Sequence, residues 1–183
     1  MPFPRFGTDL IMQDKPLFIG ETHTDTRSLA LLAWKLMWIH DQVHAIFIEH
    51  YPSGTGPASA SIATIKDEMR SNGMMGGSWL DSRPSLPAEI AQLKYQCDRY
   101  RILLRGWDIE YRSNFQRATS SWNRKVAGKI AMDLQRQIAR HPRFYIIFGG
   151  GAHGDIMKSS GLFKDLPLFK AQGGDFVEVP RLR

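Results

Sequence analysis

A glutamate and a histidine stand two residues apart at the end of a short apolar run, and both side chains can move protons. The run Leu17–Gly20 is typical of a buried strand, and Glu21 and His23 follow it directly. A carboxylate and an imidazole placed together can act as an acid/base pair or can ligate a divalent metal. The same spacing also fits a structural role, in which His23 caps the next helix and Glu21 faces its amino end. One pair therefore does not decide between chemistry and capping.

Polar side chains also end three later apolar runs. Glu49 ends one, Asp108 ends the next, and His153 follows the last after three glycines and an alanine. The carboxyl ends of parallel strands open onto one crevice, so groups from distant parts of the chain can meet there. This convergence favours a reaction centre over capping. The side chains that could converge there are Glu21, His23, Glu49, Asp108 and His153.

The segments between these residues alternate between strand-like and helix-like patterns. Strands are expected at 17–20, 45–49, 101–107, 144–148 and 176–179. Helices are expected at 26–40, 62–70, 88–100 and 113–140. Near-continuous apolar strands are typical of a parallel sheet that is covered on both faces. We therefore predict a single α/β domain over residues 1–183, with a mainly parallel central β-sheet and helices on both faces.

Two segments, 53–61 and 72–87, are rich in glycine, serine and proline, and we expect both to be mobile loops. The first helix has cap candidates in Thr24, Asp25 and Thr26.

The composition limits the class of protein. The 183 residues are 43% hydrophobic, which suits one packed globular domain. The net charge of +6 is scattered, and no run of lysines and arginines is long enough to predict a nucleic-acid patch. No transmembrane segment or signal-peptide core is expected. Cys97 is the only cysteine, which excludes an intrachain disulfide and favours a reducing compartment such as the cytoplasm.

Three short motifs resemble those of the erythromycin-esterase/ChaN-like superfamily. They are Gly20-Glu21-Thr22-His23, the strand end Ile48-Glu49, and the Gly-Gly-Ala-His step that finishes at His153. This superfamily includes macrolide esterases, haem-linked ChaN lipoproteins, TraB/TIKI proteins and domains of large bacterial toxins. The longer string Gly-Glu-Thr-His-Thr-Asp, with Arg27 after it, looks most like the toxin and type III effector members, including effectors of plant pathogens.

The resemblance implies an EreA/ChaN-like virulence protein that is secreted into a host cell by a signal-peptide-independent route. There it would act on a host substrate or host protein and trigger host cell responses or death. The resemblance implies that the catalytic residues are Glu21, His23, Glu49 and His153, and it places Arg27 near a functional arginine of some members. Macrolide hydrolysis is not expected, because the chain lacks the length for the helical insertions of the esterases. Haem binding is not expected either, because no lipoprotein signal is evident.

The predicted chemistry is hydrolysis. One imidazole, His23 or His153, would take a proton from water. One carboxylate, Glu21 or Glu49, would orient that imidazole or act as the base itself. A metal-assisted form is the second version of the hypothesis, with these four side chains as ligands of a divalent transition metal.

Three further residues are candidates for substrate binding or support. Arg27 either pairs with a nearby carboxylate or binds an anionic part of the substrate. Asp108 either supports the site or caps the following segment. His50, beside Glu49, is a candidate supporting group. The alternative function is a non-enzymatic virulence effector that binds a host protein or ligand.

Overall fold

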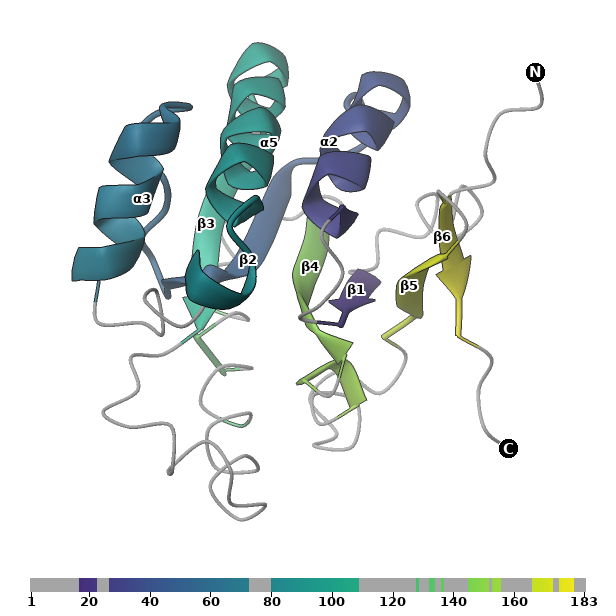
Figure 1. The fold of residues 1–183 in the computed structure, drawn as a ribbon. Coiled ribbons are helices and arrows are strands. Elements are labelled where there is room, and N and C mark those ends of the chain that lie inside the picture. Colours follow the sequence, from purple (N-terminus) through teal and green to yellow (C-terminus); the bar gives the residue numbers. More distant parts are fainter. Residues whose placement is uncertain are drawn as a thin grey trace.

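Six strands of the described residues form one sheet, and helices pack against it (Figure 1). The computed structural model describes residues 17–22, 27–72, 80–108, 145–151, 153–155, 166–172 and 175–179, with single residues at 128, 132, 133 and 136. The strands are β1 (Leu17–Glu21), β2 (Ala45–Pro52), β3 (Leu103–Asp108), β4 (Tyr145–Gly150), β5 (Leu168–Gln172) and β6 (Asp175–Glu178). The longer helices are α2 (Ser28–Ile39), α3 (Ile62–Ser71) and α5 (Leu86–Tyr100).

The strand order is β3-β2-β4-β1-β5-β6, and every neighbouring pair is parallel except β5 with β6. The predicted α/β fold with a mainly parallel sheet is therefore confirmed. Strand β4 lies between β1 and β2, so the carboxyl ends of these three strands are neighbours at one edge of the sheet. This topology brings distant parts of the chain to one place.

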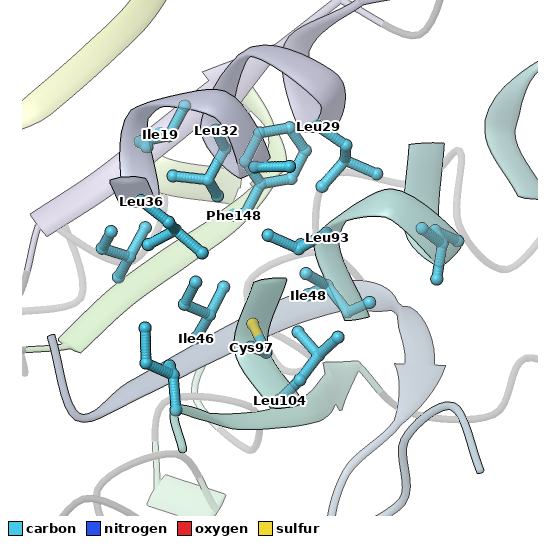
Figure 2. Packing of buried hydrophobic residues seen from close by; sticks show 14 of the residues in the cluster. Ile19, Leu29, Leu32, Leu36, Ile46, Ile48, Leu93, Cys97, Leu104 and Phe148 are labelled. Carbon is cyan, nitrogen blue, oxygen red and sulfur yellow. The ribbon is translucent and has the colours of Figure 1, made fainter. Parts of the chain in front are cut away.

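Helices α3, α5 and α2 stand side by side on one face of the sheet (Figure 1). Helix α2 buries the predicted stripe of Leu29, Leu32, Leu36 and Ile39. These side chains belong to a cluster of buried apolar residues from the helices and from this face of the sheet (Figure 2). Burying one such leucine stabilises the folded state by roughly 1.5–3 kcal/mol. This layer therefore holds in place the sheet whose carboxyl edge carries the polar side chains.

The other face of the sheet carries a second apolar cluster, to which Phe18, Phe47, Ile147 and Trp107 contribute. The strands are thus apolar on both sides, as expected of a parallel sheet. The helix predicted at 113–140 lies almost wholly outside the described residues. Only positions 128, 132, 133 and 136 of this segment are described, and all four are helical. None of the described helices is both long and apolar enough to cross a bilayer.

Strand β5 was not predicted. It pairs antiparallel with β6, and the Gln172 to Asp175 pair leaves two residues, Gly173 and Gly174, between the strands. A Gly-Gly step between two short apolar runs is a sequence signal for a tight hairpin. The prediction missed it because Pro167 and Lys170 interrupt the apolar pattern of this short edge strand.

Two helix starts differ from the prediction. Helix α2 begins at Ser28, two residues late, and its N-cap is Arg27 without a side-chain cap bond. The cap candidates at 24–26 lie outside the described residues. Helix α5 begins at Leu86, and residues 80–82 are also helical, so the prediction of a loop over 72–87 is wrong for those positions. Pro87 fits the first turn of a helix, where no backbone N–H is needed.

Strand β2 bulges against β3 just before its carboxyl end. Ile48 pairs with Gly106 and Pro52 pairs with Asp108, so three residues of β2 lie opposite one residue of β3. Gly106 makes this possible, because a Cβ at that position would overlap the carbonyl oxygens of Tyr51 and Pro52. A bulge of this kind re-aims side chains near the end of a strand.

We expect Gly106→Ala to lower the free energy of unfolding by about 1–3 kcal/mol, because the added methyl must push the β2 backbone away. Urea denaturation measures the change. Gly128→Ala is the matched control, since a Cβ there meets no described atom within 4 Å and the position is helical. An equal loss of stability in both variants would contradict this account of the bulge.

Candidate active site

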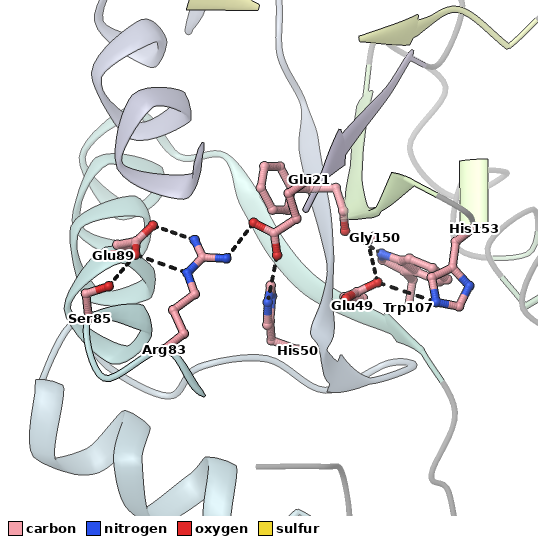
Figure 3. Close-up of polar contacts among 10 residues, drawn as sticks. Glu21, Glu49, His50, Arg83, Ser85, Glu89, Trp107, Gly150 and His153 are labelled. Carbon is pink, nitrogen blue, oxygen red and sulfur yellow. Dashed lines mark hydrogen bonds and ion pairs between the residues drawn. The ribbon is translucent and has the colours of Figure 1, made fainter. Parts of the chain in front are cut away.

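Glutamates and histidines from β1, β2 and the segment after β4 meet at the carboxyl edge of the sheet (Figure 3). Glu21 ends β1, Glu49 and His50 lie in the bulge of β2, and His153 follows β4. Glu21, Glu49 and His50 are buried, and each offers a ligand atom within 4.8 Å of the other two. Glu21, Glu49, His50 and His153 together form the Glu/His cluster.

Glu49 is held by the backbone of β4. Its Oε2 accepts a hydrogen bond of 2.7 Å from the Gly150 N–H, and His153 Nε2 lies 3.7 Å from the same oxygen. Gly149 leaves the room that the carboxylate occupies, since a Cβ there would come within 2.6 Å of Oε2. The Trp107 ring stands edge-on to the His153 ring, at 5.5 Å between centroids. Glu49 and His153 therefore form a pair whose geometry is set by neighbouring groups.

Glu21 and His50 form the second carboxylate and imidazole pair. His50 Nε2 lies 3.4 Å from Glu21 Oε1, and both side chains have no exposed surface. The other Glu21 oxygen, Oε2, accepts a hydrogen bond of 2.6 Å from Arg83 Nη1. This pair therefore lies behind the surface of the protein, whereas the His153 side chain keeps 14% of its surface exposed.

Arg83 links the cluster to the start of α5. Its Nε and Nη2 donate to the two carboxylate oxygens of Glu89, at 3.2 and 2.7 Å, and Ser85 Oγ also donates to Glu89. Burial by itself would lower the pKa of Arg83, but the hydrogen bonds to Glu89 and the charge of Glu21 outweigh it and raise that pKa. The guanidinium is therefore a permanent buried cation that is matched by two carboxylates.

The structure brings together three of the predicted catalytic residues: Glu21, Glu49 and His153. The fourth, His23, lies outside the described residues. His50, predicted as a support, is a member of the cluster itself.

The other two predicted supporting residues are not members of the ligand group of Glu21, Glu49 and His50. Arg27 is exposed at the start of α2, and Asp108 is buried at the end of β3. A different arginine, Arg83, contacts the site carboxylate Glu21. Sequence reasoning missed it because Arg83 stands in a Ser- and Pro-rich stretch that is typical of a solvent-exposed loop. Its partner Glu89 looks like an ordinary acidic residue of a first helical turn.

Glu21, Glu49 and His50 are also the described residues best placed to hold a metal ion. Two carboxylates and one imidazole suit a divalent transition metal. This set shares both glutamates with the predicted ligand set but contains His50, from the bulge of β2. The donor chemistry therefore fits the metal-assisted form of the hypothesis.

Comparison with known proteins places the fold among bacterial effectors and toxins. No protein-family profile and no curated sequence matches the chain. Its structure is similar to that of the type III effector HopBA1, with a TM-score of 0.58 and 15% identity over 79% of this chain and 71% of that one. It is also similar to a bacterial protein toxin, with a TM-score of 0.62 and 18% identity over 94% of this chain and 37% of that one. At these identities the likeness shows a shared fold.

A third similar structure is that of Pasteurella multocida toxin, whose C-terminal region is described as holding a thiol-protease-like catalytic triad. The TM-score is 0.59, with 11% identity over 91% of this chain and 24% of that one. The only cysteine of the present chain, Cys97, belongs to α5 and is buried in the apolar cluster between the helices and the sheet (Figure 2), and this burial raises the pKa of its thiol. A cysteine nucleophile therefore does not serve the Glu/His cluster.

We expect Gly149→Ala to displace the Glu49 carboxylate, because the new methyl would take the space of Oε2 and of the Trp107 ring. The free energy of unfolding should fall by about 1–3 kcal/mol, and the amide signal of Gly150 should move in a ¹H–¹⁵N spectrum. Gly151→Ala is the matched control, because a Cβ there would lie 3.9 Å from its nearest described neighbours. A Gly150 signal that moves no more in Gly149→Ala than in Gly151→Ala would show that the glycine does not shape the site.

Proposed function

We propose that this protein is an effector- or toxin-type hydrolase that acts on a host-cell substrate through the Glu/His cluster. The observation that carries the proposal is the contact between Glu49 and His153 at a sheet edge, where a second carboxylate and a second imidazole lie directly behind. Positioned acid and base groups of this kind accelerate hydrolysis because they need no reorganisation during the reaction.

The roles within the cluster follow from exposure. His153 is the partly exposed member, so it is the group that would take a proton from an attacking water. Glu49, fixed by the Gly150 N–H, would orient the imidazole and stabilise its charged form. Glu21 and His50, which lie behind this pair, would set the electrostatic field that acts on it. His23 stays a proposed member, as the imidazole that protonates the leaving group.

In the metal-assisted form, Glu21, Glu49 and His50 would hold the ion. A divalent metal at such a site supplies an activated water at neutral pH. His153 would then lie beside the ligand Glu49 and would hold the proton that the water releases.

Delivery into a host cell is the setting that we propose for this activity, because the fold is shared with a type III effector and with bacterial toxins. The erythromycin-esterase/ChaN-like likeness of the motifs supports hydrolysis as the class of reaction. The substrate is to be found among esters, amides and phosphate esters.

A second candidate function is non-enzymatic binding of a host protein. It is favoured by an apolar surface on α2, where Trp34 and Trp38 are 44% and 40% exposed and pack edge-on at 4.2 Å between ring centroids. Exposed large apolar side chains that gather in one place often mark an interaction surface. In a host-cell response assay, Glu49→Gln would abolish an enzymatic effect, whereas Trp34→Ser with Trp38→Ser would abolish a binding effect.

We expect Glu49→Gln and His153→Asn each to lower the hydrolysis rate by about 10²–10⁴-fold, because each removes half of a proton-transfer pair. The measurement is turnover of an ester, amide and phosphate-ester panel by the folded proteins, with His23→Ala tested beside them. His44→Gln is the control, since His44 is an exposed histidine at the opposite end of β2. Turnover that persists in both site variants would exclude the proposed site.

Metal dependence is tested separately by chelation and by measurement of bound metal. If the metal-assisted form holds, the protein should bind about one divalent ion per chain, and Glu21→Gln and His50→Gln should each weaken that binding. Activity should then fall on chelation and return when Zn²⁺ or Mn²⁺ is added. Full activity after exhaustive chelation, with no metal detected, would select the metal-independent form.

A further inference from the structure

We propose that Arg83 is a positioning residue, which fixes the Glu21 carboxylate from the start of α5 and so sets the geometry of the Glu/His cluster. The inference deepens the proposed function, on which its catalytic consequence rests. Its structural part concerns only how Arg83 acts on Glu21 and His50, and it can be tested without any substrate.

The first step is the anchoring of the guanidinium. Arg83 engages Glu89 through two parallel hydrogen bonds, and Ser85 Oγ holds one of the same carboxylate oxygens at 2.9 Å. Glu89 lies in the first turn of α5, where the helix dipole favours a negative charge. A fork of this type fixes both the distance and the plane of the guanidinium. Arg83 is therefore a rigid extension of the amino end of α5.

The second step is the reach from this anchor to the cluster. The remaining Arg83 group, Nη1, donates to Glu21 Oε2 at 2.6 Å. With that oxygen fixed, the second oxygen of Glu21 is directed at His50 Nε2, 3.4 Å away. Glu21, His50 and Arg83 all have side chains without exposed surface, so solvent does not compete for these contacts.

The third step separates positioning from substrate binding. Nε, Nη1 and Nη2 of Arg83 all engage carboxylates, and the side chain has no exposed surface. Such an arginine does not reach a substrate. Its effect on any reaction must pass through Glu21, and this dependence is what an experiment can detect.

The test compares Arg83→Gln, Glu21→Gln and the double variant of both. Long-range ¹H–¹⁵N spectra of the imidazole rings, recorded at one fixed pH, report the surroundings of His50, whose signals are assigned with His50→Gln. We expect Arg83→Gln and Glu21→Gln to shift the His50 signals in similar ways, and the double variant to add no further shift. Where a substrate is found, Arg83→Gln should lower the rate by about 10–100-fold, as expected when a group that orients a site side chain is lost. It should cause no further loss in the Glu21→Gln background.

Lys35→Met is the matched control for general destabilisation. Lys35 is 2% exposed and forms an ion pair of 2.7 Å with Asp175, which joins α2 to β6 and shares no residue with the cluster. This variant should lower the melting temperature while leaving the His50 signals and the rate in place. Arg83→Lys should fall between Arg83→Gln and the parent protein, since it keeps the charge but loses the fork.

Two outcomes would overturn the proposal: His50 signals that are unchanged in Arg83→Gln, or effects of Arg83 and Glu21 that simply add. If Arg83→Gln does not fold, the double variant Arg83→Gln with Glu89→Gln takes its place, because it removes the buried cation together with one of its carboxylate partners. The His50 signals of that variant then decide the question. A parent protein with no turnover would contradict the proposed hydrolase, while the spectra would still decide the role of Arg83.

Discussion

The site depends on a mismatch in length between two neighbouring strands. Three residues of β2 lie opposite one residue of β3, and Gly106 gives the extra backbone its room. A regular strand would send Glu49 and His50 to opposite faces of the sheet. In the bulge they offer ligand atoms within 4.8 Å of each other, and Glu49 reaches the Gly150 N–H of β4. The glycines at this edge of the sheet have no side chains to pack, and the space that this leaves lets the polar groups meet.

The second constraint is the cost of buried charge. An unpaired carboxylate in the interior is costly, and it becomes tolerable when it is paired and hydrogen-bonded. Glu21 meets this condition through Arg83, which is in turn shared with Glu89. The arrangement ties the amino end of α5 to the carboxyl end of β1. The helix layer and the polar edge are therefore parts of one structure, because movement of α5 would leave buried charges without partners.

Much of the fold could be predicted from the sequence, because buried strands and amphipathic helices follow short-range patterns. The stripe of Leu29, Leu32 and Leu36 predicts α2, and the apolar runs before Glu49 and Asp108 predict β2 and β3. The pairing of His50 with Glu21 could not be predicted, because it depends on a bulge that leaves no local signal. Arg83 was missed for a similar reason, since its partners are 62 and 6 residues away and its own surroundings are typical of a loop.

The likeness to effector and toxin structures identifies the fold, whereas the chemistry must be argued from the side chains. A thiol mechanism does not fit, because Cys97 belongs to the apolar core. What remains at the carboxyl edge is a graded series, from the partly exposed His153 through the buried Glu49 to Glu21, which is fixed by Arg83. Such a series suits proton transfer at His153, its outer end. The buried carboxylates are fixed in place, so the electrostatic field that they exert stays constant while the imidazole changes charge. This order of burial adds to the Glu49–His153 contact as support for the proposed reaction centre, because in a purely structural salt-bridge network no member needs to face solvent.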